Sequence, residues 1–308
     1  MLTLWYDGPP DQLQALRTVA AVYAADAFSG TRPTALLGDA SFRRLLRLIR
    51  LVRPTIAGAQ TLRLSAAGAS TTPLTRLTAA LCDVLGLTPT TGAADVLIRL
   101  RRPPDGAPGW QVLARLGRRP LSVRPWRICD MPGALNATVA AAMVELAGAA
   151  PGHRFLNVAC GSGTLCIERL QSGTAATVVG VDVDALALSC AGQNLSAAGC
   201  AHAVSLVESD AASLPFAAGV FDVIVSDLPF GMSVGSPRGN QALYPAVLAE
   251  AGRVAANGAR LVAITTARRL FESAARSVPQ WTVADRVPVR LPTRSGIIRP
   301  CIYLCRRA

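Results

Sequence analysis

From residue 133 onward, short apolar segments alternate with segments of helical character, and this alternation is the strongest constraint on the fold. A helix that joins two neighbouring strands makes those strands parallel, so the pattern predicts an α/β domain with a doubly wound, mostly parallel sheet. The last two strands, 281–289 and 301–305, have no helix between them and predict an antiparallel hairpin at the sheet edge. The other expected strands are 155–159, 177–181, 204–207, one that starts at 221, and 261–265, and the expected helices are 137–148, 164–170, 185–198, 244–254 and 267–275.

Residues 1–119 predict a smaller, basic α+β domain in front of this sheet. Apolar residues recur at helical spacing in 39–52, and two apolar strand candidates flank a turn rich in proline and glycine. The expected elements are a strand at 2–6, an alanine-rich helix before residue 35, helices at 39–52 and 73–85, and strands at 62–65, 95–100 and 111–116. We expect 120–132 to be a linker and 133–308 to be the second domain.

The chain is strongly basic, with a formal net charge of +12 over 308 residues, and all 31 basic side chains are arginine. Seventeen arginines and eight acids lie in residues 1–130, against 14 arginines and 11 acids in 131–308, so the front part carries most of the excess. This asymmetry favours a polyanionic partner, most simply nucleic acid. The absence of lysine excludes Schiff-base chemistry and a Walker-type phosphate site.

Two groups of residues are candidate RNA contacts. Arg43, Arg47 and Arg50 form a stripe along the expected helix 39–52, although such a stripe is as typical of a solvated face. The second group mixes arginine with tryptophan, which suits phosphate contact with base stacking and also suits an arginine-decorated linker. Its members are Arg118, Arg119, Arg124, Trp126 and Arg127.

Nothing in the sequence indicates a signal peptide or a membrane span. The eight cysteines lie mostly within apolar segments and never as Cys-x-x-Cys, which favours reduced core cysteines and argues against a metal site. We therefore expect a cytoplasmic protein with neither a metal nor a membrane partner, and the sequence leaves its oligomeric state open. The cysteines are Cys82, Cys129, Cys160, Cys166, Cys190, Cys200, Cys301 and Cys305.

Polar groups follow four successive strands of the predicted sheet. Residues 157–164 form a glycine turn that opens a helix and lets a ligand approach the backbone, but Cys166 stands where a dinucleotide site needs glycine. Asp182 ends the next strand, where a carboxylate can bind two ribose hydroxyls, and Asp210 follows the third, where it can accept the amino hydrogens of adenine. One such acid alone is more often structural, but the set favours a cofactor site. The candidate cofactor-binding residues are Asn157, Ala159, Cys160, Gly161, Ser162, Gly163, Asp182, Val183, Asp210 and Ala211.

The fourth strand stops abruptly at Asp227-Leu228-Pro229-Phe230-Gly231. An exocyclic base amine is a poor nucleophile, and the Asp227 carboxylate and the Leu228 carbonyl could accept its two hydrogens. Phe230 could stack on the base, while Pro229 shapes the turn. These four residues are the candidate catalytic residues. The alternative is an ordinary strand end with a capping aspartate and a turn proline.

On these motifs, residues 133–308 resemble a class I S-adenosylmethionine-dependent methyltransferase, and more narrowly the THUMP-domain RNA guanine-N2 methyltransferases. The family's glycine loop reads Asp-x-x-Cys-Gly-Ser-Gly-Thr, which 160–164 match, and its later motif reads Asp/Asn-x-Pro-Phe/Tyr-Gly, which 227–231 match. Segment 131–136 is similar to the one that the family lays beside the methionine part of the cofactor, and 113–126 is similar to the end of a THUMP domain. The chain departs from the family at Asn157, where an acid is usual, and its front part is short for a complete THUMP-containing region.

The resemblance implies a Rossmann-like fold, S-adenosylmethionine as the cofactor, and methyl transfer to guanine N2 of tRNA, or less readily of ribosomal RNA. It also implies that the basic front domain clamps the RNA backbone. Two alternatives stay open. An adenine-N6 methyltransferase acting on DNA or RNA would grip its amine equally well with the same motif. An inactive methyltransferase-like RNA-binding protein would account for Asn157 and for the short front part.

Overall fold

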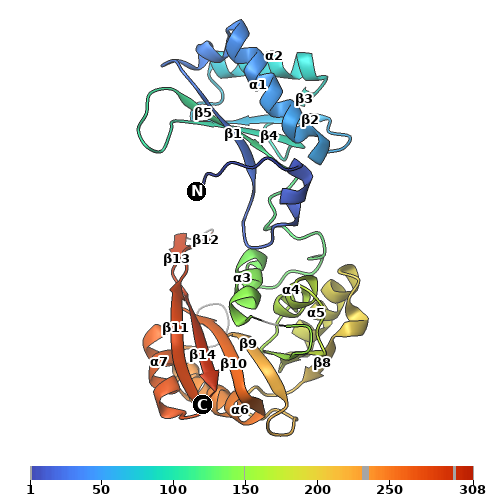
Figure 1. The fold of residues 1–308 in the computed structure, drawn as a ribbon, viewed down its shortest axis with the longest axis vertical. Coiled ribbons are helices and arrows are strands. Elements are labelled where there is room, and N and C mark those ends of the chain that lie inside the picture. Colours follow the sequence, from blue (N-terminus) through green and yellow to red (C-terminus); the bar gives the residue numbers. More distant parts are fainter. Residues whose placement is uncertain (1, 149, 231–235, 294–295, 308) are drawn as a thin grey trace. The chain divides into compact units, whose positions relative to one another are not determined.

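The structure, a computed structural model, describes residues 2–148, 150–230, 236–293 and 296–307. The chain forms two compact units, Met1–Val123 and Arg124–Ala308, which run from blue to green and from green to red in Figure 1. Each unit has its own sheet and its own hydrophobic core. The boundary therefore falls inside the segment that we expected to be a linker.

The front unit is a five-stranded sheet with two helices on one face (Figure 1). The helices α1 (Asp39–Val52) and α2 (Thr72–Leu85) share one core with alternate residues of the strands. In spatial order the strands are β1 (Tyr23–Phe28), β5 (Trp110–Arg115), β4 (Val96–Arg101), β2 (Thr61–Ser65) and β3 (Thr88–Pro89). The 3-10 helices η1, η2 and η3 are Pro10–Ala15, Pro33–Leu37 and Arg53–Thr55.

Two expectations for the start of the chain are wrong. Residues 2–6 form no strand, and part of the alanine-rich region expected to be helical is the strand β1. This strand pairs antiparallel with β5 along its whole length, from Tyr23 opposite Arg115 to Phe28 opposite Trp110. The helix propensity of alanine is a weak preference, and ladder hydrogen bonds with burial of Phe28 outweigh it.

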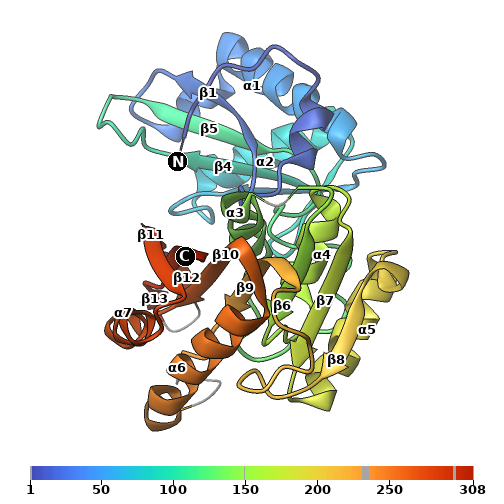
Figure 2. The same cartoon turned by 60° about the horizontal axis from the view of Figure 1, so that its bottom comes forward.

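The second unit is built on a seven-stranded sheet that Figure 2 shows most openly. The five strands from β10 to β8 are parallel, whereas β14 and β11 are antiparallel, which confirms the predicted edge hairpin. A separate small hairpin of β12 (Leu291–Thr293) and β13 (Gly296–Ile298) lies between them in the chain. In spatial order the sheet is β11 (Trp281–Pro288), β14 (Cys301–Arg307), β10 (Ala255–Thr265), β9 (Phe221–Asp227), β6 (Arg154–Val158), β7 (Thr177–Asp182) and β8 (Ser205–Glu208).

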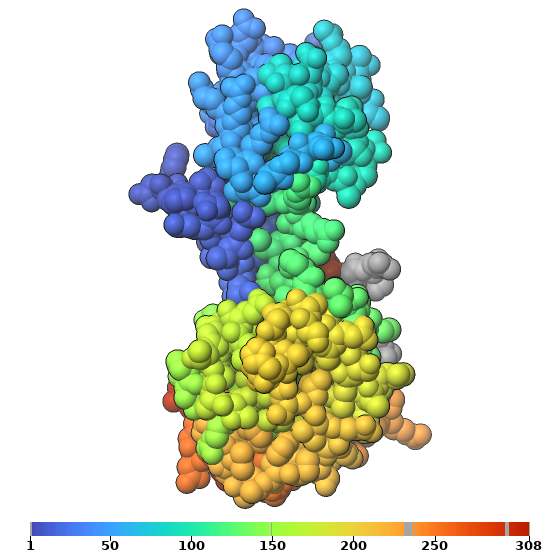
Figure 3. All heavy atoms as spheres, turned by 90° about the vertical axis from the view of Figure 1, so that its right-hand side faces the viewer, coloured from blue at the N-terminus to red at the C-terminus, as the bar shows by residue number. Residues whose placement is uncertain are grey.

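Helices cover both faces of this sheet. One core is shared by α3 (Ala137–Ala147) and α4 (Thr164–Gln171), and another by α6 (Pro237–Val254) and α7 (Arg268–Ser277). The yellow and gold atoms of α5 (Ala185–Ala197) and the region around β8 face the viewer in Figure 3. The chain runs outward from β6 through β7 to β8 and then returns to β9 on the other side of β6. This reversal is a topological switch point, beside which ligands bind in open α/β sheets.

No helix among the described residues has the length and apolar character needed to cross a membrane.

The segment that opens the second unit packs against α4 and α5. The buried guanidinium of Arg124 donates to the carboxylate of Glu168 at 2.9 Å. Trp126, 5% exposed, packs with Ile167 and Leu195 in a small cluster of their own. From Arg124 onward the expected linker is therefore part of a folded unit, because a distant acid and two apolar side chains fix it.

Asn194 on α5 holds the end of this segment. Its Oδ1 accepts the N–H groups of Ile128 at 3.0 Å and Cys129 at 2.9 Å, and its Nδ2 donates to the carbonyls of Cys129 and Ser162. Cys129 and Cys190 form a disulfide with their Cα atoms 5.5 Å apart. The expectation of eight reduced cysteines is wrong for these two, because the fold joins positions that are distant in sequence; the other six are free.

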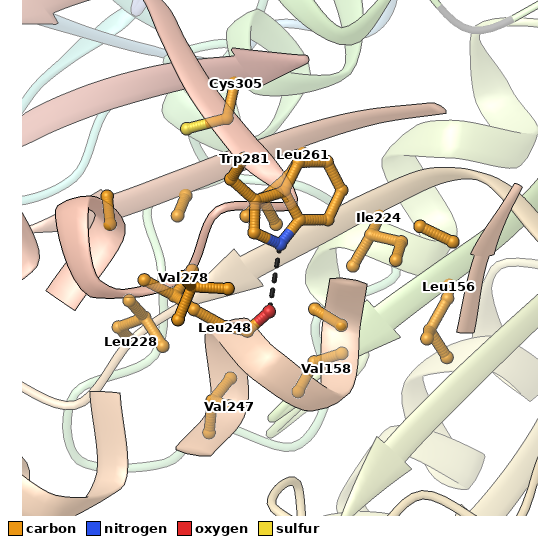
Figure 4. Packing of buried hydrophobic residues seen from close by; sticks show 14 of the residues in the cluster. Leu156, Val158, Ile224, Leu228, Val247, Leu248, Leu261, Val278, Trp281 and Cys305 are labelled. Atoms are coloured by element: carbon orange, nitrogen blue, oxygen red, sulfur yellow. Dashed lines mark hydrogen bonds between the residues drawn. The ribbon is translucent and has the colours of Figure 1, made fainter. Parts of the chain in front are cut away.

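The Trp281 side chain packs the start of β11 against α6 (Figure 4). Its indole is 4% exposed and lies among Leu248, Leu261, Val278 and other buried side chains. The indole N–H donates to the Leu248 carbonyl at 2.9 Å, so the polar atom of this large ring is also satisfied. The antiparallel edge is thereby tied to α6, which borders the site described below.

We expect Trp281→Ala to lower the free energy of unfolding by about 3–5 kcal/mol, because it empties a packed site and removes the indole hydrogen bond to the Leu248 carbonyl. Val283→Ala is the matched control on the same strand, where the side chain is 38% exposed, and its cost should stay below about 1 kcal/mol. Urea denaturation followed by circular dichroism measures both. Equal losses in the two variants would contradict this account of the core.

Candidate active site

The carboxyl ends of four neighbouring strands meet at one edge of the second sheet. The strands β9, β6, β7 and β8 are parallel, with Val158 opposite both Val181 and Ser226. The glycine loop and the three acids of the predicted site follow these strands directly. The structure therefore brings the loop and the acids to the same edge, at the switch point of the sheet.

The glycine loop has the backbone that its sequence suggests, with one addition. Gly161 and Gly163 have φ angles of +51° and +77°, and Ala159 has a φ of +53°, a left-handed conformation that costs a non-glycine residue free energy. A Cβ on Gly161 would meet no atom within 4 Å, whereas a Cβ on Gly163 would lie 3.1 Å from the Cβ of Ala191. One glycine thus leaves an open space above the loop, and the other allows α5 to pack closely.

The loop leads into the N-terminus of α4 without a capping side chain. Gly163 occupies the capping position, so no side chain accepts the first N–H groups of the helix. These groups carry partial positive charge and bind anionic ligand groups readily. The backbone of the loop could therefore hold a carboxylate.

Three side chains that we expected at the cofactor are buried beneath the loop. The Asn157 side chain is fully buried, and its Nδ2 donates to the carbonyl of Val225 on the neighbouring strand at 3.3 Å. Cys160 and Ser162 are also buried, and burial raises the pKa of the Cys160 thiol. The Asn157 side chain is therefore held within the sheet, and all three residues can contribute main-chain atoms to a cofactor site.

Asp182 lies at the end of β7 beside the loop. Its Oδ2 accepts the N–H of Gly161 at 2.8 Å and its Oδ1 accepts the N–H of Asp184 at 3.1 Å. A carboxylate has about four acceptor sites, so two remain for the hydroxyls of a ligand. The next side chain, Val183, is 70% exposed and offers an apolar surface to a planar group.

Asp210 follows β8 and is exposed. Its Oδ1 accepts the N–H of Ala212 at 2.9 Å, which closes a local turn around the half-buried Ala211. The second carboxylate oxygen has no hydrogen-bond partner among the described residues. Asp210 is thus placed to accept a ligand hydrogen at the same edge, farther out than Asp182.

Asp227, the last residue of β9, differs from the other two acids. Its Oδ1 is buried and no described residue donates to it. Burial raises the pKa of Asp227 to about 7. The capping alternative is wrong, because Ser236 is the N-cap of α6 and accepts the N–H of Gly239 at 3.0 Å. A buried carboxyl oxygen without a donor costs free energy, and such groups are typical of functional sites.

The turn after Asp227 is held by a buried polar network. The Pro229 carbonyl accepts the Nδ2 of Asn240 at 2.7 Å and the hydroxyl of Tyr244 at 2.9 Å. That hydroxyl also lies 2.7 Å from the Oγ1 of Thr265, at the end of β10. All three network side chains are at most 2% exposed. The turn is therefore fixed from both α6 and β10.

Phe230 lines a hollow of about 510 Å3 next to this turn. The other residues that line it are Asn240, Gln241, Thr266, Ala267, Arg268, Arg269 and Leu270. Gly231, the last residue of the motif, lies outside the described residues. Sequence reasoning missed Asn240 and Tyr244, and the only local signal was their spacing of four residues, which places both on one face of a helix.

The first group of candidate RNA contacts is exposed as expected. Arg43, Arg47 and Arg50 lie along the solvent face of α1, whose opposite face buries the apolar side chains of the core. Arg118 and Arg119 are exposed as well, and the Arg118 guanidinium pairs with Asp95 at 2.6 Å. The front unit thus presents cations on its surface.

Three members of the second group are wrong as RNA contacts. Arg124 is paired with buried Glu168, and Trp126 is buried in an apolar cluster. Arg127 donates to the carbonyl of Leu135 at 2.7 Å and to the Oγ1 of Thr164 at 2.9 Å. Their side chains hold the start of the second unit in place, and none is free to reach a phosphate or a base.

Within the described ranges, no group of three or more His, Cys, Asp or Glu side chains could hold a metal ion.

Comparison with known proteins supports the architecture. The crystal structure of TrmN from Thermus thermophilus has a TM-score of 0.74 at 23% sequence identity and covers 100% of this chain and 88% of its own. The structure of SMU.472, complexed with SAH, has a TM-score of 0.65 at 14% identity and covers 93% and 82%. Both likenesses concern the fold.

Curated relatives match part of the chain. The tRNA (guanine(6)-N(2))-methyltransferase THUMP3 of Bos taurus is 28% identical over 189 residues, which are 57% of this chain and 37% of that protein. The tRNA (guanine(6)-N2)-methyltransferase of Thermus thermophilus is 31% identical over 183 residues, which are 56% of this chain and 54% of that protein. The matched region therefore spans about a third to a half of these relatives.

The model of the UPF0020 family matches residues 124–295, which is more than half of the chain and includes the glycine loop, the acids and the turn after β9. The chain belongs to this family, whose model is described as RMKL-like, methyltransferase domain.

Proposed function

We propose that the protein is an S-adenosylmethionine-dependent RNA methyltransferase that methylates N2 of guanine, in tRNA rather than ribosomal RNA. The observation that carries this proposal is the buried Asp227 Oδ1, an acceptor without a donor at the switch point of a methyltransferase fold. The names of the relatives favour guanine N2 and tRNA over other amines and other RNAs. Action on tRNA is consistent with a cytoplasmic location.

The residues at the edge of the sheet fit S-adenosylmethionine. The open space above Gly161 and the uncapped start of α4 suit the methionine end. The unused acceptor sites of Asp182 suit the ribose hydroxyls, the exposed Val183 suits one face of adenine, and Asp210 suits its amino group. When bound, the cofactor supplies an electrophilic methyl group. The inward side chain of Asn157 leaves this pocket to main-chain atoms and to the acids.

The chain's own residues would hold and activate the target amine. The Asp227 carboxylate and the Leu228 carbonyl accept its two hydrogens, which draws the nitrogen lone pair out of the ring and toward the methyl donor. Phe230 stacks on the base after it leaves its helix or loop. A carboxylate with a pKa of about 7 can then take up the proton that the nitrogen loses. The network around the Pro229 carbonyl keeps this turn in place.

Incubation of the purified protein with methyl-labelled S-adenosylmethionine and total RNA, followed by nucleoside analysis, tests the proposal. We expect N2-methylguanosine in the tRNA fraction. N6-methyladenosine would favour the adenine enzyme instead. No label in any RNA, together with tight binding of both cofactor and RNA, would favour the inactive RNA-binding protein.

We expect Asp227→Asn to separate activity from stability. Activity should fall by about 100-fold or more while cofactor affinity stays within a few-fold, because the lost acceptor contacts only the base.

The pKa of Asp227 is raised by burial to about 7, so the folded state favours the neutral acid. Ionisation of Asp227 therefore lowers the free energy of unfolding. The loss grows between about pH 4 and pH 7, by roughly 1.4 kcal/mol per pH unit, and reaches its full size above pH 7. The variant should therefore be more stable than the native protein at pH 8, with a smaller gain at pH 4.5.

Asp222→Asn is the control on the same strand, and its effect on the free energy of unfolding should have the opposite sign. A side-chain hydrogen bond from Arg154 lowers the pKa of Asp222 to about 2, so its charged form stabilises the fold above pH 4. This variant should lose stability at pH 8 and lose less near pH 3. Urea denaturation at each pH measures both variants, and loss of cofactor binding in Asp227→Asn would show that its role is misassigned.

The native enzyme's kcat should rise with pH to a plateau above about pH 7, because Asp227 acts in its ionised form.

The arginines of α1 generate a separate prediction. Changing Arg43, Arg47 and Arg50 together to glutamine should weaken RNA binding and lower the slope of log K against log salt concentration by roughly 2, because three phosphate contacts are lost. Filter binding at several salt concentrations measures the slope.

The matched control removes the same charge elsewhere. Arg76, Arg276 and Arg306 are exposed on other elements, and their joint replacement by glutamine should change the slope by less than half as much. Equal effects of the two triple variants would assign the stripe to a solvated face with no specific contact.

A further inference from the structure

The hollow beside Phe230 contains an acceptor that the mechanism above does not use. Asn240 lines this hollow although its side chain is 2% exposed. It lies near the start of α6, next to the turn that carries the candidate catalytic residues. The oxygen and the nitrogen of a buried amide normally both have hydrogen-bond partners.

The hydrogen bonds fix which way the amide points. One branch lies 2.7 Å from the Pro229 carbonyl, and a carbonyl oxygen accepts but never donates, so that branch is the Nδ2. The Oδ1 is therefore the other branch. Among the described residues, none donates a hydrogen bond to it. Because this side chain lines the hollow, its free acceptor is available to a hydrogen-bond donor of a ligand.

The Watson–Crick edges of the two purines differ at the atom next to the methylated amine. Guanine carries a donor, N1–H, beside its N2 amine, whereas adenine carries a bare acceptor, N1, beside its N6 amine. Sites that read a flipped base do so through hydrogen bonds to this edge. A fixed acceptor near the amine site therefore attracts guanine and repels adenine, because two lone pairs would face each other.

We propose that the Asn240 Oδ1 accepts the N1–H of the target base and selects guanine over adenine. The inference rests on the proposed function and names its specificity-determining residue. The motif at 227–230 grips any planar amine, so it cannot make this choice. Asn240 can, because its donor half is committed to the turn and its acceptor half is left for the base.

The rest of the hollow is consistent with guanine. The exposed side chains of Arg268 and Arg269 line it, and a guanidinium only donates hydrogen bonds. Guanine continues from N1–H to the acceptor O6, whereas adenine continues from N1 to an apolar C2–H. The hollow thus offers both an acceptor for N1–H, at Asn240, and arginine donors for O6.

A purely structural role for Asn240, as a clamp on the Pro229 carbonyl, makes a different prediction. Tyr244 donates to the same carbonyl at 2.9 Å, so Tyr244→Phe also loosens the turn. This variant leaves the Asn240 amide in place. It therefore separates loss of the clamp from loss of the acceptor.

The test uses the RNA that the native protein labels, rebuilt by ligation with 2-aminopurine in place of the methylated guanine. The analogue keeps the N2 amine and has an acceptor at N1. We expect the native enzyme to prefer guanine by at least 100-fold in kcat/KM, and Asn240→Ala to reduce that preference to below about 10-fold. Tyr244→Phe should lower kcat and keep the native preference. Comparison between variants cancels the different reactivities of the two amines.

The outcomes are distinct. A native enzyme that makes no N2-methylguanosine would overturn the proposed function and this inference together. A native enzyme that makes N2-methylguanosine, with the preference unchanged in Asn240→Ala, would overturn the inference alone. An equal loss of preference in Asn240→Ala and Tyr244→Phe would assign Asn240 to the clamp.

Discussion

The parallel pairing of β9 with both β6 and β10 is the constraint on which the candidate site depends. Ile224 belongs to the core on one face of the sheet, and Val223 and Val225 belong to the core on the other. A shift of one residue would misalign the pairing on both edges and move Asp222 or Asp227 into the sheet, so the register of this strand is strongly specified. Its last residue, Asp227, therefore lies at the same edge of the sheet as the glycine loop that follows β6. The position of the carboxyl follows from core packing and not from the loop that comes after it.

Several groups at this edge are unfavourable on their own. Asp227 has a buried oxygen without a donor, the Oδ1 of Asn240 has none among the described residues, and Ala159 has a left-handed backbone. The buried Asp227 oxygen and the Ala159 backbone cost free energy, and they persist because the surrounding contacts determine them. The bonds from Asn240 and Tyr244 to the Pro229 carbonyl are such contacts. Asp227 and Ala159 both lie at the same edge of the sheet, where a ligand could relieve the cost at Asp227.

The sequence predicts most of the second unit because its signals are local. Strand periodicity, the glycine loop and the acids after strand ends are each contained in a few consecutive residues, and the structure has them where expected. The failures are non-local. The strand β1 exists because β5 pairs with it, Arg124 is buried because Glu168 neutralises it, and the Cys129–Cys190 pair exists because α5 meets the start of the unit. Asn240 carries no motif at all, and its importance emerges only from its contact with the turn.

The disulfide between Cys129 and Cys190 has a topological consequence. The two cysteines are 61 positions apart, and the ring that they close contains α3, β6, the glycine loop, α4 and β7. Closing a ring of this length removes chain entropy from the unfolded state worth about 4 kcal/mol in the loop-closure model. The glycine loop and Asp182 thus lie inside a covalent ring, whereas Asp210 and the turn after β9 lie in the open chain that follows it. Oxidation of two cysteines outside the candidate catalytic turn therefore raises the free energy of unfolding of the unit that carries the candidate site.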